Sequence, residues 1–337
     1  MIGKVIVCKS AGEASLESFE IPALKPGEVL IESAYSVISA GTELANVKQL
    51  PNTNTAQTGF PYYPGYCTVG QIIQVGANVE TLGMGDRVIV SWGGHRSHTV
   101  KKAESVLRID DASIDLLDAS FAHIASFSFL GVRKLKLEIG ESAMIVGQGI
   151  LGVLALQIAI LSGAIPVVVS DLDPERRRLA LELGATAAFD PNEDDFVKKV
   201  KEVCGGDGPN AVVEVTGSAV ALQQSLTYIA WEGRISLLGC TRVSDASIDY
   251  YKYVHRRGIS IIGAHTFTRP NHESAPGRWT EHDDYQTYLK LVAAGKLKIR
   301  PLISDIVPPE NANAVYNRLA HAENPPMGIV FDWSMTK

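Results

Sequence analysis

A short glycine-rich segment near the middle of the chain constrains the fold more than any other feature. Residues 147–152 read Gly-Gln-Gly-Ile-Leu-Gly, the spacing GxGxxG. An apolar run at 143–146 precedes this segment, and the run 151–162 that follows has the length of a helix. In such a context the first glycine permits a tight turn, the second lets the backbone approach a diphosphate, and the third lets helix pack on strand. The segment therefore predicts a strand–turn–helix unit that binds a dinucleotide.

An acidic residue stands where such a unit needs one. Asp171 ends the next expected strand, nineteen residues after Gly152. A carboxylate there accepts hydrogen bonds from ribose hydroxyls and repels a 2′-phosphate, so the sequence favours NAD over NADP. Three arginines at 176–178 follow one turn later, and they could serve a phosphate. Arginines on a helix more often form a solvated face, so we retain NAD as the expected cofactor.

The second half of the chain alternates expected strands with expected helices. Strands are expected at 143–146, 165–170, 185–190, 211–214, 234–238 and 259–263, and helices at 151–162, 174–183, 194–204 and 219–229. This alternation predicts an α/β fold with a parallel, doubly wound sheet, whose ligands bind beyond the carboxyl ends of the strands. Two turns, Thr216-Gly217 and Gly239-Cys240, follow such strands and are expected near the nicotinamide. The expected cofactor contacts are Gly147, Gly149, Ile150, Leu151, Gly152, Asp171, Thr216 and Gly239.

The first 118 residues have a different pattern, in which short apolar runs alternate with Gly and Pro turns. The runs lie at 29–35, 68–75, 87–91 and 98–101. Regularly spaced short strands of this kind indicate a small, irregular barrel. The tail from residue 266 is mixed, with helices expected at 283–294 and from about 308 to 321 and a final strand at 328–332. We therefore expect three segments, at 1–118, 119–265 and 266–337.

Composition excludes several classes of function. The 31 basic and 37 acidic residues give a net charge of −6, and apart from the three arginines at 176–178 no cluster of Lys or Arg stands out, so we expect no nucleic-acid partner and no binding to a membrane surface. The four scattered cysteines include no C-x-x-C pair, which argues against a disulfide framework and a structural zinc lobe. The first residues lack the pattern of a signal peptide. We expect a cytoplasmic protein with a small-molecule substrate.

At this point the chain resembles the medium-chain dehydrogenase/reductase superfamily, the alcohol-dehydrogenase-like one, nearly end to end. The most specific matching stretches are 64–70 (PGYCTVG), 83–88 (GMGDRV), 140–152 and 213–217 (VEVTG). The resemblance implies a GroES-like catalytic domain at 1–118, a Rossmann dinucleotide-binding domain at 119–265 and a C-terminal return to the catalytic domain at 266–337. It also implies a nicotinamide-dependent oxidoreductase, a substrate cleft between the domains, and a homodimer joined through the strand at 259–263.

The chain departs from the zinc-dependent members of this superfamily at the metal ligands. Those members hold zinc with Cys, His and Cys or Asp, whereas Ala40 and Tyr66 stand at the first two positions here and the third falls at 122–123. A catalytic zinc needs three protein ligands in fixed geometry, so we expect no bound zinc. An unusual ligand set stays open, made of Cys67, His123 and Glu43.

Without zinc, side chains must stabilise charge on the substrate oxygen and move the proton. Thr42 matches the family's hydroxyl-relay position, and Tyr66 would place a phenol where a ligand pointed into the cleft. His123 also stands at a ligand position, and His95 lies in a glycine-hinged loop, where an imidazole suits proton transfer near neutral pH. Each residue also has a structural reading, as a turn threonine, an aromatic that fills the metal space, or a buried histidine. We take all four as candidate catalytic residues.

These features predict an NAD(H)-dependent oxidoreductase that acts on a secondary alcohol or ketone without catalytic zinc. The segments 39–43 (SAGTE) and 64–66 (PGY) resemble a branch that includes bacteriochlorophyllide dehydrogenases, although fold and cofactor site do not fix the substrate. Three alternatives stay open: a zinc-free quinone or enoyl reductase, a non-catalytic NAD(H) sensor, and a zinc enzyme with an unusual ligand set.

Overall fold

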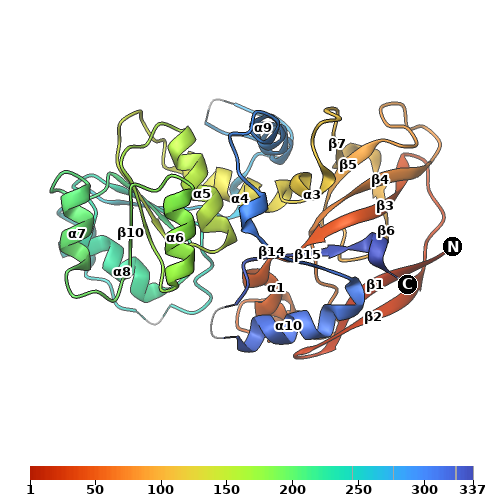
Figure 1. Ribbon diagram of the computed structural model, residues 1–337, viewed down its shortest axis with the longest axis horizontal. Coiled ribbons are helices and arrows are strands. Elements are labelled where there is room, and N and C mark those ends of the chain that lie inside the picture. Colours follow the sequence, from red (N-terminus) through yellow and green to blue (C-terminus); the bar gives the residue numbers. More distant parts are fainter. Residues whose placement is uncertain (245, 276, 323–324, 337) are drawn as a thin grey trace. The chain divides into compact units, whose positions relative to one another are not determined.

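The computed structural model describes residues 1–244, 246–275, 277–322 and 325–336, and the chain divides into two compact units (Figure 1). Unit 1 comprises Met1–Ile124, Tyr285–Gly295 and Ile299–Lys337, and unit 2 comprises Ala125–Asp284 and Lys296–Lys298. The unit limits near 124 and 284 differ from the expected boundaries after 118 and 265. Both limits fall inside helices, α4 (Ala122–Lys134) and α9 (Glu281–Ala293). A unit boundary that falls inside a helix is not marked by the Gly or Pro residues that mark a turn, so the sequence pattern does not reveal it.

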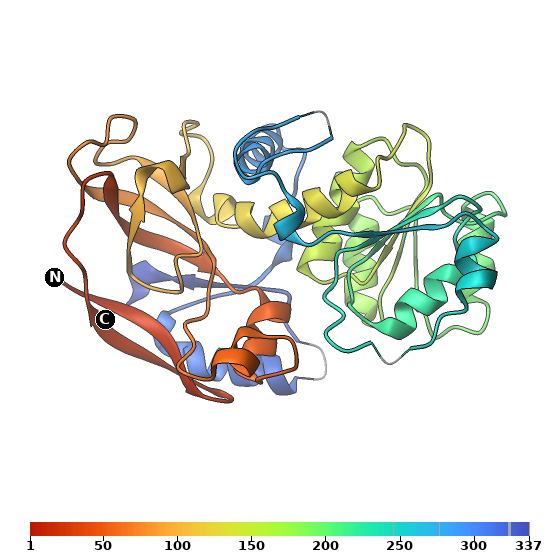
Figure 2. The same ribbon diagram turned by 180° about the vertical axis from the view of Figure 1, so that it is seen from behind.

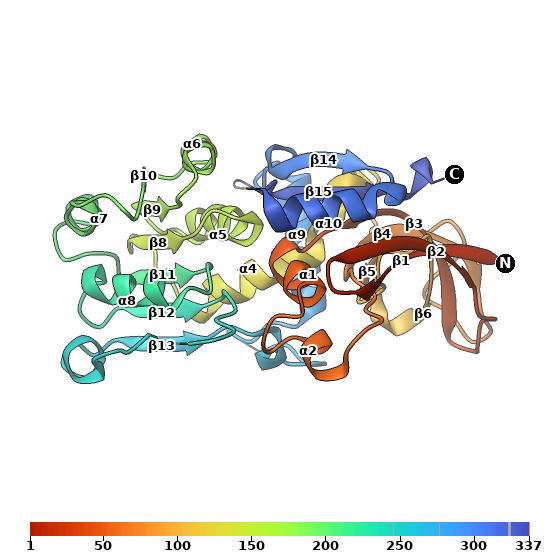
Figure 3. The ribbon, with the colours of Figure 1, turned by 90° about the horizontal axis from the view of Figure 1, so that it is seen from below.

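Unit 2 contains a six-stranded sheet in the order β10-β9-β8-β11-β12-β13. The labels of these strands follow one another in this order from top to bottom on the left of Figure 3. Every neighbouring pair in this sheet is parallel. The strands are β8 (Ala143–Val146), β9 (Val167–Ser170), β10 (Ala187–Phe189), β11 (Ala211–Glu214), β12 (Arg234–Leu237) and β13 (Ser260–Gly263). The connecting helices are α5 (Ile150–Leu161), α6 (Pro174–Glu182), α7 (Phe196–Val203) and α8 (Ala219–Tyr228). The predicted doubly wound Rossmann sheet is confirmed.

The strand order of unit 2 creates the place where a ligand binds. The chain runs from β8 outward to β9 and β10, and then returns past β8 to β11, so the order reverses beside β8. Ligands of open α/β sheets bind beyond the carboxyl ends of the strands at such a reversal. All residues of β8, β9 and β11 are buried, which explains why these strands are apolar up to their last residues, Ser170 in β9 and Glu214 in β11. The turn from β8 into α5 therefore lies at the expected ligand site.

Unit 1 is built around a seven-stranded sheet and a separate hairpin. The sheet order is β14-β15-β3-β4-β5-β7, and β6 also pairs with β3. The strands are β3 (Glu28–Val37), β4 (Cys67–Val75), β5 (Arg87–Ser91), β6 (His98–Lys102), β7 (Val106–Arg108), β14 (Ile303–Val307) and β15 (Gly328–Asp332), and the hairpin pairs β1 (Ile2–Ser10) with β2 (Glu13–Glu20). The last strand, β15, lies antiparallel to β3 (Figure 1).

Helices complete unit 1 and position one strand end for function. The helices that lie wholly in this unit are α1 (Ala40–Val47), α2 (Asn54–Thr58), α3 (Leu116–Ala119) and α10 (Ala312–His321). Helix α10 lies beside α1 (Figure 2), and their shared core includes Val47, Tyr316 and Phe331. Because α1 starts three residues after β3 ends, this core fixes the turn between them and the first residues of α1.

Candidate functional site

The glycine segment forms the turn between β8 and α5 in unit 2. Gly147 has a φ of +92°, and a Cβ there would lie 2.7 Å from the Thr216 Cγ2 atom. A Cβ on Gly152 would lie 1.9 Å from the carbonyl oxygen of Gly147. Both positions therefore require glycine, the first for its backbone conformation and the second for the approach of the helix to the turn.

Gly149 differs from its two neighbours in the motif, because a Cβ there would meet no atom within 4 Å. It is the N-cap of α5, and no side chain caps this end of the 12-residue helix. Ile150 and Leu151 follow as the first helical residues, whose N–H groups have no acceptor within a helix. Open space beside such N–H groups, at the positive end of the helix dipole, fits a diphosphate.

Asp171 lies against this turn. Its Oδ2 atom accepts a hydrogen bond from the N–H of Gln148 at 2.6 Å, and its Oδ1 atom accepts one from the N–H of Asp173 at 2.9 Å. The carboxylate thus stands next to the glycine turn, at the end of the neighbouring strand β9. The turn and the acid together fit the diphosphate and ribose of a dinucleotide.

The arginines that follow Asp171 are already paired with acids. Arg176, Arg177 and Arg178 lie 3.8, 3.3 and 3.0 Å from carboxylate oxygens of Asp173, Asp190 and Glu175, respectively. Arg177 also donates a hydrogen bond to the carbonyl oxygen of Asp171 at 2.7 Å. Their charges are therefore balanced within the α6 region, whose helix begins at the Asp173 N-cap and Pro174.

A buried glutamate shapes the next turn of the sheet, which sequence reasoning did not single out. Glu214 ends β11 and is completely buried. Its carboxylate accepts hydrogen bonds from the N–H groups of Thr216 and Gly217 at 2.8 and 3.1 Å and from the Thr216 hydroxyl. Burial raises the pKa of Glu214, and these donors oppose that rise. A Cβ on Gly239 would lie 2.3 Å from the N–H nitrogen of Gly217, so the two predicted turns pack tightly.

In unit 1, four aromatic side chains gather where β4 begins, β5 ends and α4 begins, and the fourth of them comes from α9. The ring of Tyr66 lies 5.1 Å from the ring of Trp92 and 5.3 Å from that of His123, centre to centre. His123 is buried, and its Nδ1 atom is hydrogen bonded to the hydroxyl of Tyr285. Trp92 is 58% exposed and has a φ of +56°, a left-handed conformation that is strained for a bulky residue. An exposed indole therefore borders a buried phenol.

The hydroxyl of Tyr66 belongs to a small set of hydroxyl groups. It donates a hydrogen bond to Ser39 Oγ, and it also interacts with the Thr42 side chain in the first turn of α1. Burial raises the pKa of Tyr66 well above its ordinary value, whereas the hydrogen bonds with Ser39 and Thr42 lower it. The phenol therefore stays protonated near neutral pH and has two hydroxyls that can stabilise its anion.

His95 lies in a neighbouring buried network rather than in the aromatic cluster. Its Nε2 atom lies 3.0 Å from Glu43 Oε2, and its Nδ1 atom lies 2.8 Å from Ser36 Oγ. Glu43 also accepts hydrogen bonds from the Tyr316 hydroxyl at 2.5 Å and from the N–H of Ser39 at 2.8 Å. His95 and Glu43 are both completely buried. The pair thus holds the backbone of Ser39, whose side chain accepts the Tyr66 hydrogen bond.

The residues at the family's metal positions do not fit a catalytic zinc. Ala40 has no donor atom, the Tyr66 hydroxyl is bonded to Ser39, and the His123 Nδ1 atom is bonded to Tyr285. Within the ranges that the structure describes, no group of three His, Cys, Asp or Glu side chains is arranged to hold a metal, including the set of Cys67, His123 and Glu43.

The predicted site residues thus fall into two groups. Unit 2 contains all eight expected cofactor contacts, at the carboxyl ends of β8, β9, β11 and β12. Unit 1 contains the four candidate catalytic residues, of which Thr42, Tyr66 and His123 share one cluster. Sequence reasoning missed Ser39 and considered Glu43 only as a possible metal ligand, although both lie with Thr42 in the segment SAGTE. Among the described residues, no helix is long and apolar enough to span a bilayer.

Two family models match the chain. The model described as "Alcohol dehydrogenase GroES-like domain" matches residues 25–129, and the model described as "Zinc-binding dehydrogenase" matches residues 151–293. The L-threonine 3-dehydrogenase of Pyrococcus abyssi is 28% identical over 335 residues, which cover 89% of this chain and 90% of the relative. The D-guloside 3-dehydrogenase of Escherichia coli is 25% identical over 352 residues, which cover 97% and 100%.

Solved structures share the fold over the full length. An oxidoreductase/dehydrogenase of unknown specificity from Escherichia coli matches with a TM-score of 0.87 at 18% identity, covering 100% of both chains. A Sinorhizobium meliloti protein assigned as a zinc-binding dehydrogenase, solved with NADP bound, matches with a TM-score of 0.83 at 21% identity, covering 98% of this chain and 99% of that one. With the family models and the full-length relatives, these matches confirm the resemblance: the chain belongs to the medium-chain dehydrogenase/reductase superfamily and is an NAD(P)-dependent oxidoreductase.

Proposed function

We propose that the protein transfers a hydride between NAD(H) and a secondary alcohol or ketone without catalytic zinc. The observation that carries this proposal is the Tyr66 phenol. It stands where zinc-dependent relatives have a ligand, and it is hydrogen bonded to Ser39 and next to Thr42. A ketone oxygen gains negative charge as hydride arrives at its carbon, and a buried donor can stabilise that charge in place of a metal.

Unit 2 holds the cofactor in this proposal. The first N–H groups of α5 bind the diphosphate, and the open side of Gly149 lets it approach. Asp171 accepts hydrogen bonds from the ribose hydroxyls and repels a 2′-phosphate, while the arginines of α6 are balanced by their own acids. These features favour NAD over NADP. When bound, the nicotinamide supplies or accepts the hydride.

In this proposal, Tyr66 is the residue that exchanges a proton with the substrate oxygen. In reduction the phenol donates its proton to the substrate oxygen, and the hydroxyls of Ser39 and Thr42 rotate to donate hydrogen bonds to the phenolic oxygen. In oxidation the same groups work in reverse. Thr42 carries the proton onward, as expected from its position. His123, bonded to Tyr285 and edge-on to Tyr66, fixes the ring of the phenol.

We assign His95 a positioning role in this reaction. Both of its ring nitrogens are engaged inside a fully buried network, so it does not face a substrate. Through Glu43 it holds the N–H of Ser39, and Ser39 in turn bonds to Tyr66. The pair of His95 and Glu43 therefore fixes the orientation of the Tyr66 hydroxyl.

The names of the relatives support a secondary alcohol as the substrate. L-threonine 3-dehydrogenase and D-guloside 3-dehydrogenase each act at carbon 3 of their named substrates, and L-threonine and gulosides carry a secondary hydroxyl there. Beside Tyr66, the exposed face of Trp92 offers an apolar wall on which the carbon skeleton of such a substrate can rest. We take a hydroxylated carbon skeleton with one apolar face as the substrate class.

We also propose that the protein is a homodimer. The strand β13 is the last in the sheet order of unit 2, and its residues are exposed or half-buried. An outer strand of this kind presents unpaired backbone groups that invite a second strand. Light scattering should give twice the chain mass, and a monomer at micromolar concentration would contradict this assignment.

The experiment that tests the proposed function is an assay before and after metal depletion. Purified protein is dialysed against 1,10-phenanthroline, its zinc content is measured by mass spectrometry, and NADH oxidation is followed with a panel of ketones. We expect undiminished turnover with less than about one zinc in ten chains, because a catalytic zinc needs three protein ligands and Ala40 supplies no donor atom. Turnover that is lost and then restored by added zinc would overturn the zinc-free mechanism. If only quinones or enones are turned over, the protein is a quinone or enoyl reductase instead. If NADH binds tightly but no substrate is turned over, the protein is a non-catalytic NAD(H) sensor.

A further inference from the structure

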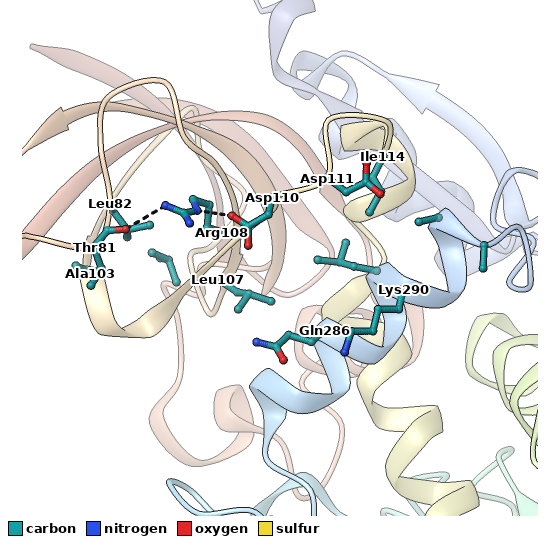
Figure 4. A pocket seen from close by; sticks show the side chains of 14 residues that line it. Thr81, Leu82, Ala103, Leu107, Arg108, Asp110, Asp111, Ile114, Gln286 and Lys290 are labelled. Carbon is teal, nitrogen blue, oxygen red and sulfur yellow. Dashed lines mark hydrogen bonds and ion pairs between the residues drawn. The ribbon is translucent and has the colours of Figure 1, made fainter.

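A cavity lies within unit 1, lined by residues other than those assigned to catalysis. Its volume is about 760 Å³, within the range of small-molecule sites. Three chain segments line it: 81–82 before β5, 103–114 around β7, and 286–294 of helix α9 and its end. Figure 4 shows Gln286 and Lys290 on α9 on one side and Leu107 and Arg108 of β7 on the other. None of these residues belongs to the aromatic cluster or to the glycine turn.

Much of the cavity wall is apolar and well packed. Val106, Ile114 and Leu289 are buried, and they contribute to the lining together with Leu82 and Leu107. Val106 also packs in the core of the sheet with partly buried Leu82. The wall is thus anchored to the sheet of unit 1 rather than to a loose loop. A site with this wall favours a ligand with an apolar body.

Every charged side chain that lines the cavity has a hydrogen-bond or ion-pair partner except one. Asp110 lies 2.5 Å from the guanidinium of Arg108. Asp111 accepts hydrogen bonds from the N–H and the hydroxyl of Ser113 at 2.9 and 2.7 Å, which lower its pKa. The ammonium group of Lys290, in contrast, makes no hydrogen bond or ion pair with any residue that the structure describes. The cavity therefore offers one free ammonium group at the edge of an apolar wall.

We propose that this cavity is a second binding site, which takes an amphipathic organic anion. The apolar body of the ligand lies along Leu82, Leu107 and Leu289, and its carboxylate or sulfonate meets Lys290, with the Gln286 amide as a further donor. This assignment does not depend on the hydride-transfer reaction. A ligand there would contact α9 and the sheet of unit 1 at once.

Decanoate is a suitable probe, because it combines a ten-carbon chain with one carboxylate. Its binding is measured by calorimetry below its micellar concentration and with saturating NAD⁺, which keeps the probe from the dinucleotide site. Decanamide is the neutral probe of the same length. Two variants test the two halves of the site: Lys290→Met removes the cation, and Leu107→Asp places a carboxylate on the apolar wall. Lys296→Met, at an exposed lysine outside the cavity, is the matched control.

We expect one decanoate per chain, weakened about threefold to fivefold by Lys290→Met, since an exposed ion pair contributes modestly. Leu107→Asp should weaken binding more than about tenfold, because the chain would meet a charge. Lys296→Met should change nothing, and decanamide should bind more weakly than decanoate. No binding at millimolar decanoate, equal binding of decanoate and decanamide, or unchanged affinity in Leu107→Asp would each overturn the proposal. So would a loss of binding in Lys296→Met equal to that in Lys290→Met.

Discussion

Tyr66 shows what a single position can and cannot reveal. Its place in the segment PGY marks it as a substitute for a metal ligand, and that could be inferred from the sequence. Its partners could not, because Ser39 and Trp92 lie 27 and 26 residues away along the chain and reach it only through the pairing of β3, β4 and β5. The position of the Tyr66 phenol could thus be predicted from the sequence, whereas its hydrogen-bond partners become known only from the fold.

The first prediction concerns the phenol itself. Replacing Tyr66 with Phe should lower kcat for ketone reduction about 100-fold, or about 2.7 kcal/mol of transition-state stabilisation, because the donor to the substrate oxygen is lost. The Kd of NADH should change less than twofold, since Tyr66 lies in the other unit. Tyr63→Phe, at a tyrosine that is 51% exposed, is the matched control and should leave both kcat and the Kd of NADH unchanged. Full turnover in Tyr66→Phe would remove the residue from the mechanism.

The pKa of Tyr66 gives a second prediction. Burial raises that pKa, so the phenol keeps its proton over the usual assay range. The kcat of ketone reduction should therefore show no alkaline decline between about pH 7 and 9 that belongs to Tyr66. A decline with an apparent pKa below 9 that disappears in Tyr66→Phe would show that the phenol ionises more readily than its burial implies.

His95 carries the third prediction. Its loop position suggested proton transfer, but its two nitrogens are bound inside a network that joins residues far apart in sequence. His95→Ala should lower the free energy of unfolding by about 3 kcal/mol, because it removes the histidine from the completely buried pair with Glu43 and leaves that carboxylate only the Tyr316 hydroxyl and the N–H of Ser39. Urea denaturation measures the change, and His98→Ala, a nearby half-buried histidine, serves for comparison. A His95→Ala variant as stable as the wild type would contradict this structural role of the buried pair.

Among elements, the strands and helices of unit 2 could be predicted closely from pattern. The expected strand at 211–214 coincides with β11, and the expected helix at 151–162 starts one residue after α5 does. Helix α4 was missed, because the segment is buried on nearly all sides and shows no amphipathic period. The β1–β2 hairpin was missed too. The buried helix α5 could be predicted because the glycine segment marks its start, whereas no such motif precedes the buried helix α4.

The glycine turn allows a fourth prediction from a matched pair of variants. Gly149→Ala should fold normally, because its Cβ meets no atom, yet weaken NADH at least about tenfold by occupying the space of the diphosphate. Gly152→Ala should instead destabilise the protein, since its Cβ would lie 1.9 Å from the Gly147 carbonyl oxygen. Calorimetry and thermal unfolding separate the two effects. Unaltered NADH affinity in Gly149→Ala would place the diphosphate elsewhere.

At the scale of the whole molecule, the division into two units was foreseeable but its limits were not. The change from β-rich to alternating pattern reveals two domains, whereas the pairing of β15 with β3 joins residues almost 300 positions apart. That return was inferred from family resemblance rather than from local signals. The cavity of unit 1 escaped notice for the same reason, because three distant segments line it. Contacts between segments that are far apart in the chain cannot be predicted from local sequence patterns.

The central claim is that the first turn of α5 and Asp171 together hold NAD. Calorimetry of the purified chain with NADH and with NADPH, in the wild type and in Asp171→Ser, tests it most directly. We expect one NADH per chain, NADPH at least about tenfold weaker, and a loss of that preference in the variant, because the carboxylate no longer repels the 2′-phosphate. Failure of both dinucleotides to bind at millimolar concentration, or an unchanged preference in Asp171→Ser, would contradict the account.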